Sequence, residues 1–233
     1  MSKQHLWETK PLEIWDRAKS LRAYWQKSID DSAGDAKKLL DYGFATPPSA
    51  EVSSIFSDVY TNSSAYTAIH WAHNESLVTG SNGKFNPGGK MTRAQFVLVL
   101  YRLAGSPAVS GSHSFGDVPA SSIASDAITW ASQNNIVTGQ AGNFNPSSSI
   151  SRAQLVLMLH RYNTLMGGDS SSDSTALSSL SDRDSISSTA REAMRWAVTH
   201  GLLTGGGGNI NPNGNMTRAQ VALVLYRYNC HSG

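Results

Sequence analysis

One short pattern occurs three times in the 233-residue chain and constrains its fold more than any other feature. It consists of Met or Ile, then Thr or Ser, then Arg-Ala-Gln, and it stands at residues 91–95, 150–154 and 216–220, each time directly before an apolar run. A hydroxyl residue followed three positions later by Gln, just before an apolar run, is typical of the capping box that starts a helix. The sequence therefore predicts three helices that begin in the same way.

Each copy of the pattern is preceded by the same markers in the same order. An Asp opens the unit, a Trp-Ala and a Thr-Gly follow, and an apolar plug residue stands beside an Asn-Pro. The opening aspartates are Asp58, Asp117 and Asp182, the tryptophans Trp71, Trp130 and Trp196, the glycines Gly80, Gly139 and Gly205, the plug residues Phe85, Phe144 and Ile210, and the motif arginines Arg93, Arg152 and Arg218. The distance from Trp to Arg is 22 residues in every copy. Markers kept in register three times predict a repeat protein.

Each repeat is predicted to be a helix, a loop and a second helix, with the repeats spanning about 53–104, 112–166 and 177–231. The first helices are expected near residues 65–75, 125–134 and 189–200, each ending before a turn in which the marker glycine supplies a positive φ. The second helices are apolar around most of their circumference, which is typical of buried helices. One unit cannot bury such a helix alone. We therefore expect an all-α fold in which three units close into a pseudo-threefold bundle.

Residues 1–50 differ from the repeats and carry Trp7, Trp15 and Trp25. Apolar residues from Leu12 to Trp25 recur at helical spacing, so the segment is predicted to contain an amphipathic helix. Three tryptophans are too much apolar surface to leave in water. The helix is expected either to pack on the repeats, which we favour, or to dock to a separate protein partner. Residues 46–49 are predicted to be the linker.

Composition argues against several classes of protein. A net charge of +2 and the lack of a basic cluster argue against nucleic-acid binding. Cys230 is the single cysteine, so no intramolecular disulfide forms. No apolar stretch is long enough to span a membrane. His70 and His73 lack further ligands at metal-binding spacing, and we expect neither a metal nor a cofactor. No catalytic motif is present, so the chain is not expected to be an enzyme.

The markers taken together resemble the S-layer homology repeat. Its pattern of Phe-x-Asp-Val, Trp-Ala, Phe-x-Pro and Ile/Met-Thr-Arg-Ala-Glu/Gln is matched over residues 56–228. Leu180, Arg183 and Ile210 depart from it in repeat three, and Gln replaces the commoner Glu after Arg-Ala. The resemblance implies a bacterial surface-anchoring module that closes into a three-pronged pseudo-trimer. It also implies that grooves between neighbouring repeats bind a secondary cell-wall polysaccharide ending in a pyruvylated amino sugar, with the motif arginines and their neighbours making many of the contacts.

The candidate ligand-binding residues each have a structural alternative. The motif arginines stand in the first turn of a helix, where free N–H groups and the dipole favour an anion, and a guanidinium fork matches a carboxylate. The opening aspartates Asp58, Asp117 and Asp182 are also candidate ligand-binding residues. Arginines and aspartates could instead pair with each other and tie down the loop. The tryptophans could stack on a sugar ring or pack in the core. The marker glycines could let the backbone approach a ligand or could end a helix.

We therefore expect a non-catalytic module that anchors to an anionic polysaccharide at the bacterial cell wall, with repeat three silent because its opening is altered. The alternative is an intracellular protein-interaction scaffold that docks through the N-terminal helix. Residues 1–8 lack the apolar core of a secretory signal, which favours a cytoplasmic scaffold if Met1 is the native start. The cell surface is expected if the chain is a mature or truncated form. A glycan-processing enzyme ranks third, because glycoside hydrolysis needs two carboxylates in unlike environments and repetition makes them alike.

Overall fold

The structure is a computed structural model that describes residues 51–231. The amphipathic helix predicted in residues 1–50, and both of its proposed roles, lie outside the described residues. Within 51–231 the regular elements are helices: α2 (Tyr66–Asn74), α3 (Arg93–Leu103), α4 (Ser125–Gln133), α5 (Arg152–Leu165), the short 3₁₀ helix η1 (Arg183–Ser185), α6 (Ser188–Thr199) and α7 (Arg218–His231). The all-α prediction is confirmed. None of the helices described is long and apolar enough to cross a membrane.

The predicted capping boxes are present at the start of α3, α5 and α7. Thr92 Oγ1 accepts a hydrogen bond from the backbone N–H of Gln95 at 3.2 Å, and the N–H of Thr92 donates to Gln95 Oε1 at 3.0 Å. The same reciprocal pair joins Ser151 to Gln154 and Thr217 to Gln220. Two donors that a helix start would otherwise leave unpaired are satisfied in each repeat.

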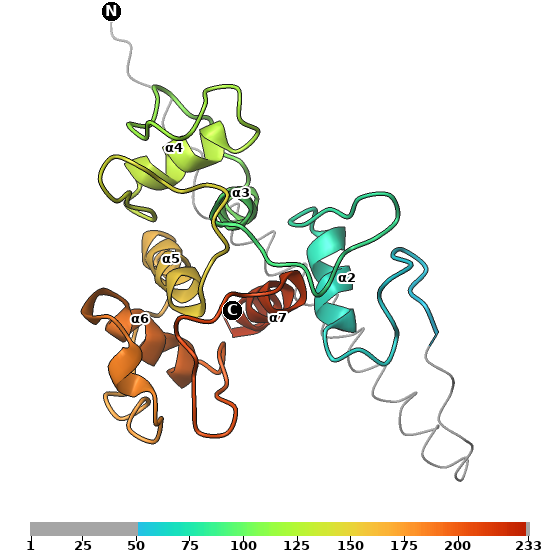
Figure 1. Cartoon of the computed structure of the whole chain (residues 1–233), viewed down its shortest axis with the longest axis vertical. Coiled ribbons are helices and arrows are strands. Elements are labelled where there is room, and N and C mark those ends of the chain that lie inside the picture. The colour runs from blue at the N-terminus through green and yellow to red at the C-terminus, as the bar shows by residue number, and fades with distance from the viewer. Residues whose placement is uncertain (1–50, 232–233) are drawn as a thin grey trace, which may run out of the picture. The chain divides into compact units, whose positions relative to one another are not determined.

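Helices from different repeats form the three lobes of this unit. The inner helices, α3, α5 and α7, lie around the centre, and the outer helices, α2, α4 and α6, lie outside them (Figure 1). Each outer helix packs on the inner helix of the preceding repeat: α4 on α3, α6 on α5 and α2 on α7. Since the first outer helix packs on the last inner helix, the three repeats close on themselves. The closed pseudo-threefold arrangement is thus the one observed.

The segments just before the inner helices meet at the pseudo-threefold axis. The N–H of Met91 donates to the carbonyl of Met216 at 3.0 Å, that of Met216 to Ile150 at 3.0 Å, and that of Ile150 to Met91 at 2.9 Å. All three side chains are buried. The three hydrogen bonds form a cycle, and every repeat supplies one donor and one acceptor. Two repeats alone cannot complete it.

Candidate functional site

The motif arginines lie at the junctions between repeats, where each faces the loop of the next repeat in the ring. Arg93 Nε donates to the carbonyl oxygen of Phe144 at 2.9 Å, and its guanidinium carbon lies 4.7 Å from the centre of the Phe144 ring. Arg218 repeats this arrangement with Phe85, at 2.8 Å and 4.7 Å. Its Nη2 also donates to the carbonyl of Thr79. At two junctions, therefore, the arginine is fixed by the plug residue of the following repeat.

Arg152 differs from the other two motif arginines. It faces the loop of repeat three, whose plug residue, Ile210, offers no ring to stack on. Its Nη1 donates a hydrogen bond to Met216 Sδ at 3.5 Å, and its Nε is buried without a hydrogen-bond partner. A cleft of about 500 Å³ opens beside it, lined by Arg152, Asp182, Gly206, Asn209, Ile210 and Asn211.

The first-turn amides of the inner helices are not free, so that part of the anion-site prediction is wrong. The N–H of Arg93 donates to the carbonyl of Ser148 at 2.9 Å, and that of Ala94 to Pro146 at 3.1 Å. Equivalent bonds join Arg152 to Gly214, Ala153 to Pro212, Arg218 to Gly89 and Ala219 to Pro87. The loop of the next repeat thus caps each helix start. An anion at a junction could therefore not be bound by these amides.

The opening aspartates hold the plug loops of their own repeats. Asp117 accepts from the backbone N–H groups of Phe144 and Asn145 at 2.8 and 2.7 Å, and Asp58 and Asp182 do the same in their repeats. Asn145 has a φ of 59°, in the left-handed region that Asn tolerates, as have Asn86 and Asn211. The ion pairs within 4.0 Å among residues 51–231 are Arg183–Asp184 and Arg195–Glu192. The motif arginines therefore form no direct ion pair with the opening aspartates, contrary to the structural alternative.

The charges of the three motif arginines are balanced differently. Burial lowers the pKa of Arg93, and the negative charge of Asp117 across the junction partly offsets this. Burial likewise lowers the pKa of Arg218, with Asp58 opposing it. For Arg152, burial lowers the pKa and the positive charge of Arg227 lowers it further. The charge of Arg152 thus has a repulsive neighbour where the other two have an attractive one.

The three tryptophans lie in the core. Trp71, Trp130 and Trp196 are only 5%, 7% and 2% exposed. Each packs against an aromatic ring from the neighbouring inner helix, Tyr226, Tyr101 and His160 respectively, with centroids 5.1 to 5.7 Å apart. Indoles packed in this way have no face open to a sugar. The prediction that they stack on a ligand is not supported, and core packing, its alternative, is what the structure shows.

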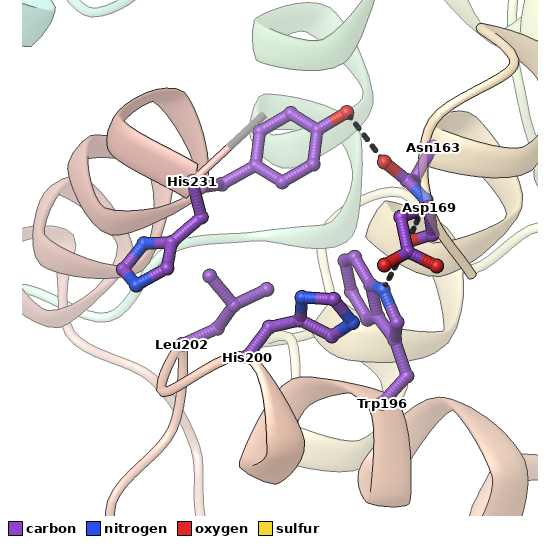
Figure 2. A pocket seen from close by; sticks show the side chains of 7 residues that line it. Asn163, Asp169, Trp196, His200, Leu202 and His231 are labelled. Atoms are coloured by element: carbon purple, nitrogen blue, oxygen red, sulfur yellow. Dashed lines mark hydrogen bonds between the residues drawn. The ribbon is translucent and has the colours of Figure 1, made fainter. Parts of the chain in front are cut away.

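A small pocket lies beside Trp196, away from the motif arginines. Figure 2 shows Trp196 between Asp169 and His200, with its Nε1 donating to the carbonyl of Asp169 at 2.9 Å. The pocket measures about 30 Å³. That volume has room for little more than a water molecule. It is too small to hold a sugar ring.

The marker glycines do not have the role that the sequence suggested. None of them has a positive φ; the left-handed residues that follow the outer helices are Ser76, Asn135 and Gly201. A Cβ atom on Gly139 would lie 2.5 Å from a ring carbon of Phe115 and 2.8 Å from the carbonyl oxygen of Asn143. These glycines are therefore required by close packing within their own repeat, and the prediction that they end a helix with a positive φ is wrong. A close approach of their backbone to a ligand stays a prediction.

Sequence reasoning missed a second set of arginines. Arg102, Arg161 and Arg227 lie further along the inner helices, and their Nη1 atoms donate to the carbonyls of Leu77, Ile136 and Leu202 at 3.1 to 3.3 Å. Each bond ties the turn after an outer helix to the inner helix of the same repeat. The signal was present in the sequence, since every apolar run after the Arg-Ala-Gln pattern ends in Arg at the same position.

A closed ring of three helical repeats, with an arginine at every junction, defines a repeat module whose candidate site is shared between neighbouring units. The S-layer homology domain matches residues 55–97, 114–156 and 179–222, more than half of the chain. The chain therefore belongs to the S-layer homology family. Domains of this family are found in S-layer proteins and surface enzymes, and they anchor these proteins to the cell wall.

Several characterised proteins are similar to the repeat region. An endoglucanase of Bacillus sp. (strain KSM-635) is 32% identical over 73% of this chain and 18% of its own length. An amylopullulanase of Thermoanaerobacterium thermosulfurigenes is 28% identical over 76% of this chain and 10% of its own. The surface-layer 125 kDa protein of Lysinibacillus sphaericus is 30% identical over 63% of this chain and 12% of its own. The chain thus spans less than a fifth of the length of these relatives.

Proposed function

We propose that this chain anchors to the cell wall by binding an anionic secondary polysaccharide at the junctions between its repeats, and that it does so without catalysis. The observation that supports this most directly is the partly buried arginine at every junction, with the next repeat as the opposite wall. A guanidinium presents a planar fork that matches a carboxylate. The pyruvyl ketal of a terminal amino sugar supplies one such carboxylate, beside hydroxyl groups that Asn and Asp side chains can bind.

The setting of the carboxylates supports a non-catalytic role. Asp58, Asp117 and Asp182 each accept two hydrogen bonds from backbone N–H groups of their own plug loop. Glycoside hydrolysis uses one carboxyl group as an acid and another as a base or nucleophile, which requires unlike environments. The three opening aspartates accept from the same pair of backbone donors and perform one structural task.

A sedimentation assay with purified cell walls tests the proposed function. The full chain is mixed with walls that carry their secondary polymer and with the same walls after chemical removal of the pyruvyl groups. We expect the chain to sediment with the first and to stay in solution with the second, since removal of the ketal removes the carboxylate. A free pyruvylated amino sugar should compete. Equal sedimentation with both wall preparations would contradict an anionic ligand.

A further inference from the structure

The three junctions are not equivalent, and at one of them the arginine Nε lacks an acceptor within the described residues. At the first and third junctions, Nε of Arg93 or Arg218 donates to a plug carbonyl, and the guanidinium lies over the plug ring. At the junction between repeats two and three, Nε of Arg152 is buried and has no acceptor. A buried donor without an acceptor loses its hydration and gains nothing in return. An acceptor supplied from outside the chain would remove this cost.

The surroundings of Arg152 favour an anionic acceptor. No aspartate opposes the effect of burial on its charge, whereas Asp117 and Asp58 do so for Arg93 and Arg218. The cleft beside it is about 500 Å³, which lies within the range of ordinary small-molecule sites. Asn209 and Asn211 on its wall are exposed and carry amide groups that suit sugar hydroxyls. The cleft therefore combines an arginine whose buried Nε lacks an acceptor with two amide side chains. It also contains the Asp182 carboxylate, whose two oxygens already accept backbone N–H groups of Ile210 and Asn211.

The departure of repeat three from the repeat pattern explains the difference. Ile210 is buried like Phe85 and Phe144, and its N–H bonds to Asp182 in the same way, so the loop keeps its course. What is missing is the aromatic face on which the guanidinium lies at the other junctions. Arg93 and Arg218 gain cation–π attraction from that face, and Arg152 does not.

We infer that the groove between repeats two and three is the principal ligand groove of this chain, that Arg152 binds the ligand carboxylate there, and that Ile210 determines this choice by leaving Arg152 unstacked. This inference rests on the proposed function and specifies which junction carries it. It reverses the expectation from the sequence that the altered repeat three would be silent. Asp182 and Ile210 of repeat three line the same cleft as Arg152 of repeat two. The altered loop of repeat three therefore affects the junction of Arg152, not that of Arg218.

Calorimetric titration of the full chain with a pyruvylated amino sugar glycoside tests the inference. We expect one principal site per chain. Arg152→Lys keeps the charge and loses the planar fork, so affinity should fall about ten- to a hundredfold. Arg161→Lys makes the same exchange in the same helix, at a residue bonded to Ile136, and should leave affinity unchanged. Ile210→Phe changes no charge and should also weaken binding, because it restores the ring that holds the arginine elsewhere.

Thermal melts of each variant separate loss of binding from loss of fold. The affinity of Ile210→Phe and the number of sites on the wild-type chain are two further results that do not depend on Arg152→Lys. Two or three equivalent sites per chain, or an unchanged affinity in both Arg152→Lys and Ile210→Phe, would overturn the inference. In that case wall binding and sugar binding by the wild-type chain persist, so the proposed function stands. A wild-type chain that binds neither the sugar nor the pyruvylated wall would overturn both.

Discussion

At the scale of single residues, the opening aspartates show how one carboxylate organises a loop. Asp182 accepts from Ile210 and Asn211, and the equivalent bonds recur in the other repeats. The N–H of Ile210 lowers the pKa of Asp182 most; burial opposes this effect, and the N–H of Asn211 adds to it. For Asp117, burial would raise the pKa, but the N–H groups of Phe144 and Asn145 and the charge of Arg93 bring it below its usual value. These aspartates therefore stabilise the fold when ionised.

This predicts acid sensitivity. A carboxyl group whose pKa is lower in the folded state contributes stability above its unfolded pKa, and this stability is lost as the pH falls through the folded pKa. The melting temperature should therefore decline below about pH 4. Asp182→Asn should have a lower melting temperature than the wild type at pH 7, and its melting temperature should fall less on acidification. Melts between pH 2 and 7 measure both effects, with the exposed Asp184→Asn as the control. A pH profile of Asp182→Asn identical to that of the wild type would contradict this role.

At the scale of elements, the inner helices depend on local caps and on neighbouring repeats at once. Ser151 closes the start of α5 through its bond from Gln154, while Gly214 and Pro212 of the next repeat accept the two preceding N–H groups. Ser151→Ala should lower the free energy of unfolding by about 1 kcal/mol, the usual cost of a lost cap. Ser147→Ala, on the exposed part of the loop, should cost much less. Denaturant unfolding of both variants measures the difference, and equal stability would contradict the capping role.

The elements also show what the sequence could and could not predict. The capping boxes and helix positions were predicted correctly because they depend on residues within one turn. The pairing of α4 with α3, and the capping of Arg93 by Ser148, were not, because one repeat carries no mark of which neighbour it meets. The sequence could not decide whether Trp71 packs in the core or stacks on a ligand, since its position in the helix pattern is the same in both cases. The sequence could not predict that Arg152 differs from the other motif arginines, because the difference arises from Ile210, which belongs to another repeat.

At the scale of the whole repeat unit, the fold depends on the junctions between repeats. Each lobe consists of one helix from each of two repeats. The cycle of hydrogen bonds at the axis includes one segment from each of the three repeats. Removal of repeat three would remove α7, which packs on α2, and α6, which packs on α5. It would also break the cycle of hydrogen bonds at the axis. The buried faces of two helices would then meet water, at about 25 cal/mol for every Å² of apolar surface exposed.

Calorimetric melting of the chain without residues 180–233, beside the full chain, tests the closed ring most directly. For the full chain we expect one cooperative transition, because no repeat buries its inner helix alone. For the truncated chain we expect no sharp transition, and instead a loosely packed or aggregated product. A sharp, reversible transition in the truncated chain would show that two repeats fold independently, and would contradict a fold and a ligand site built on closed junctions.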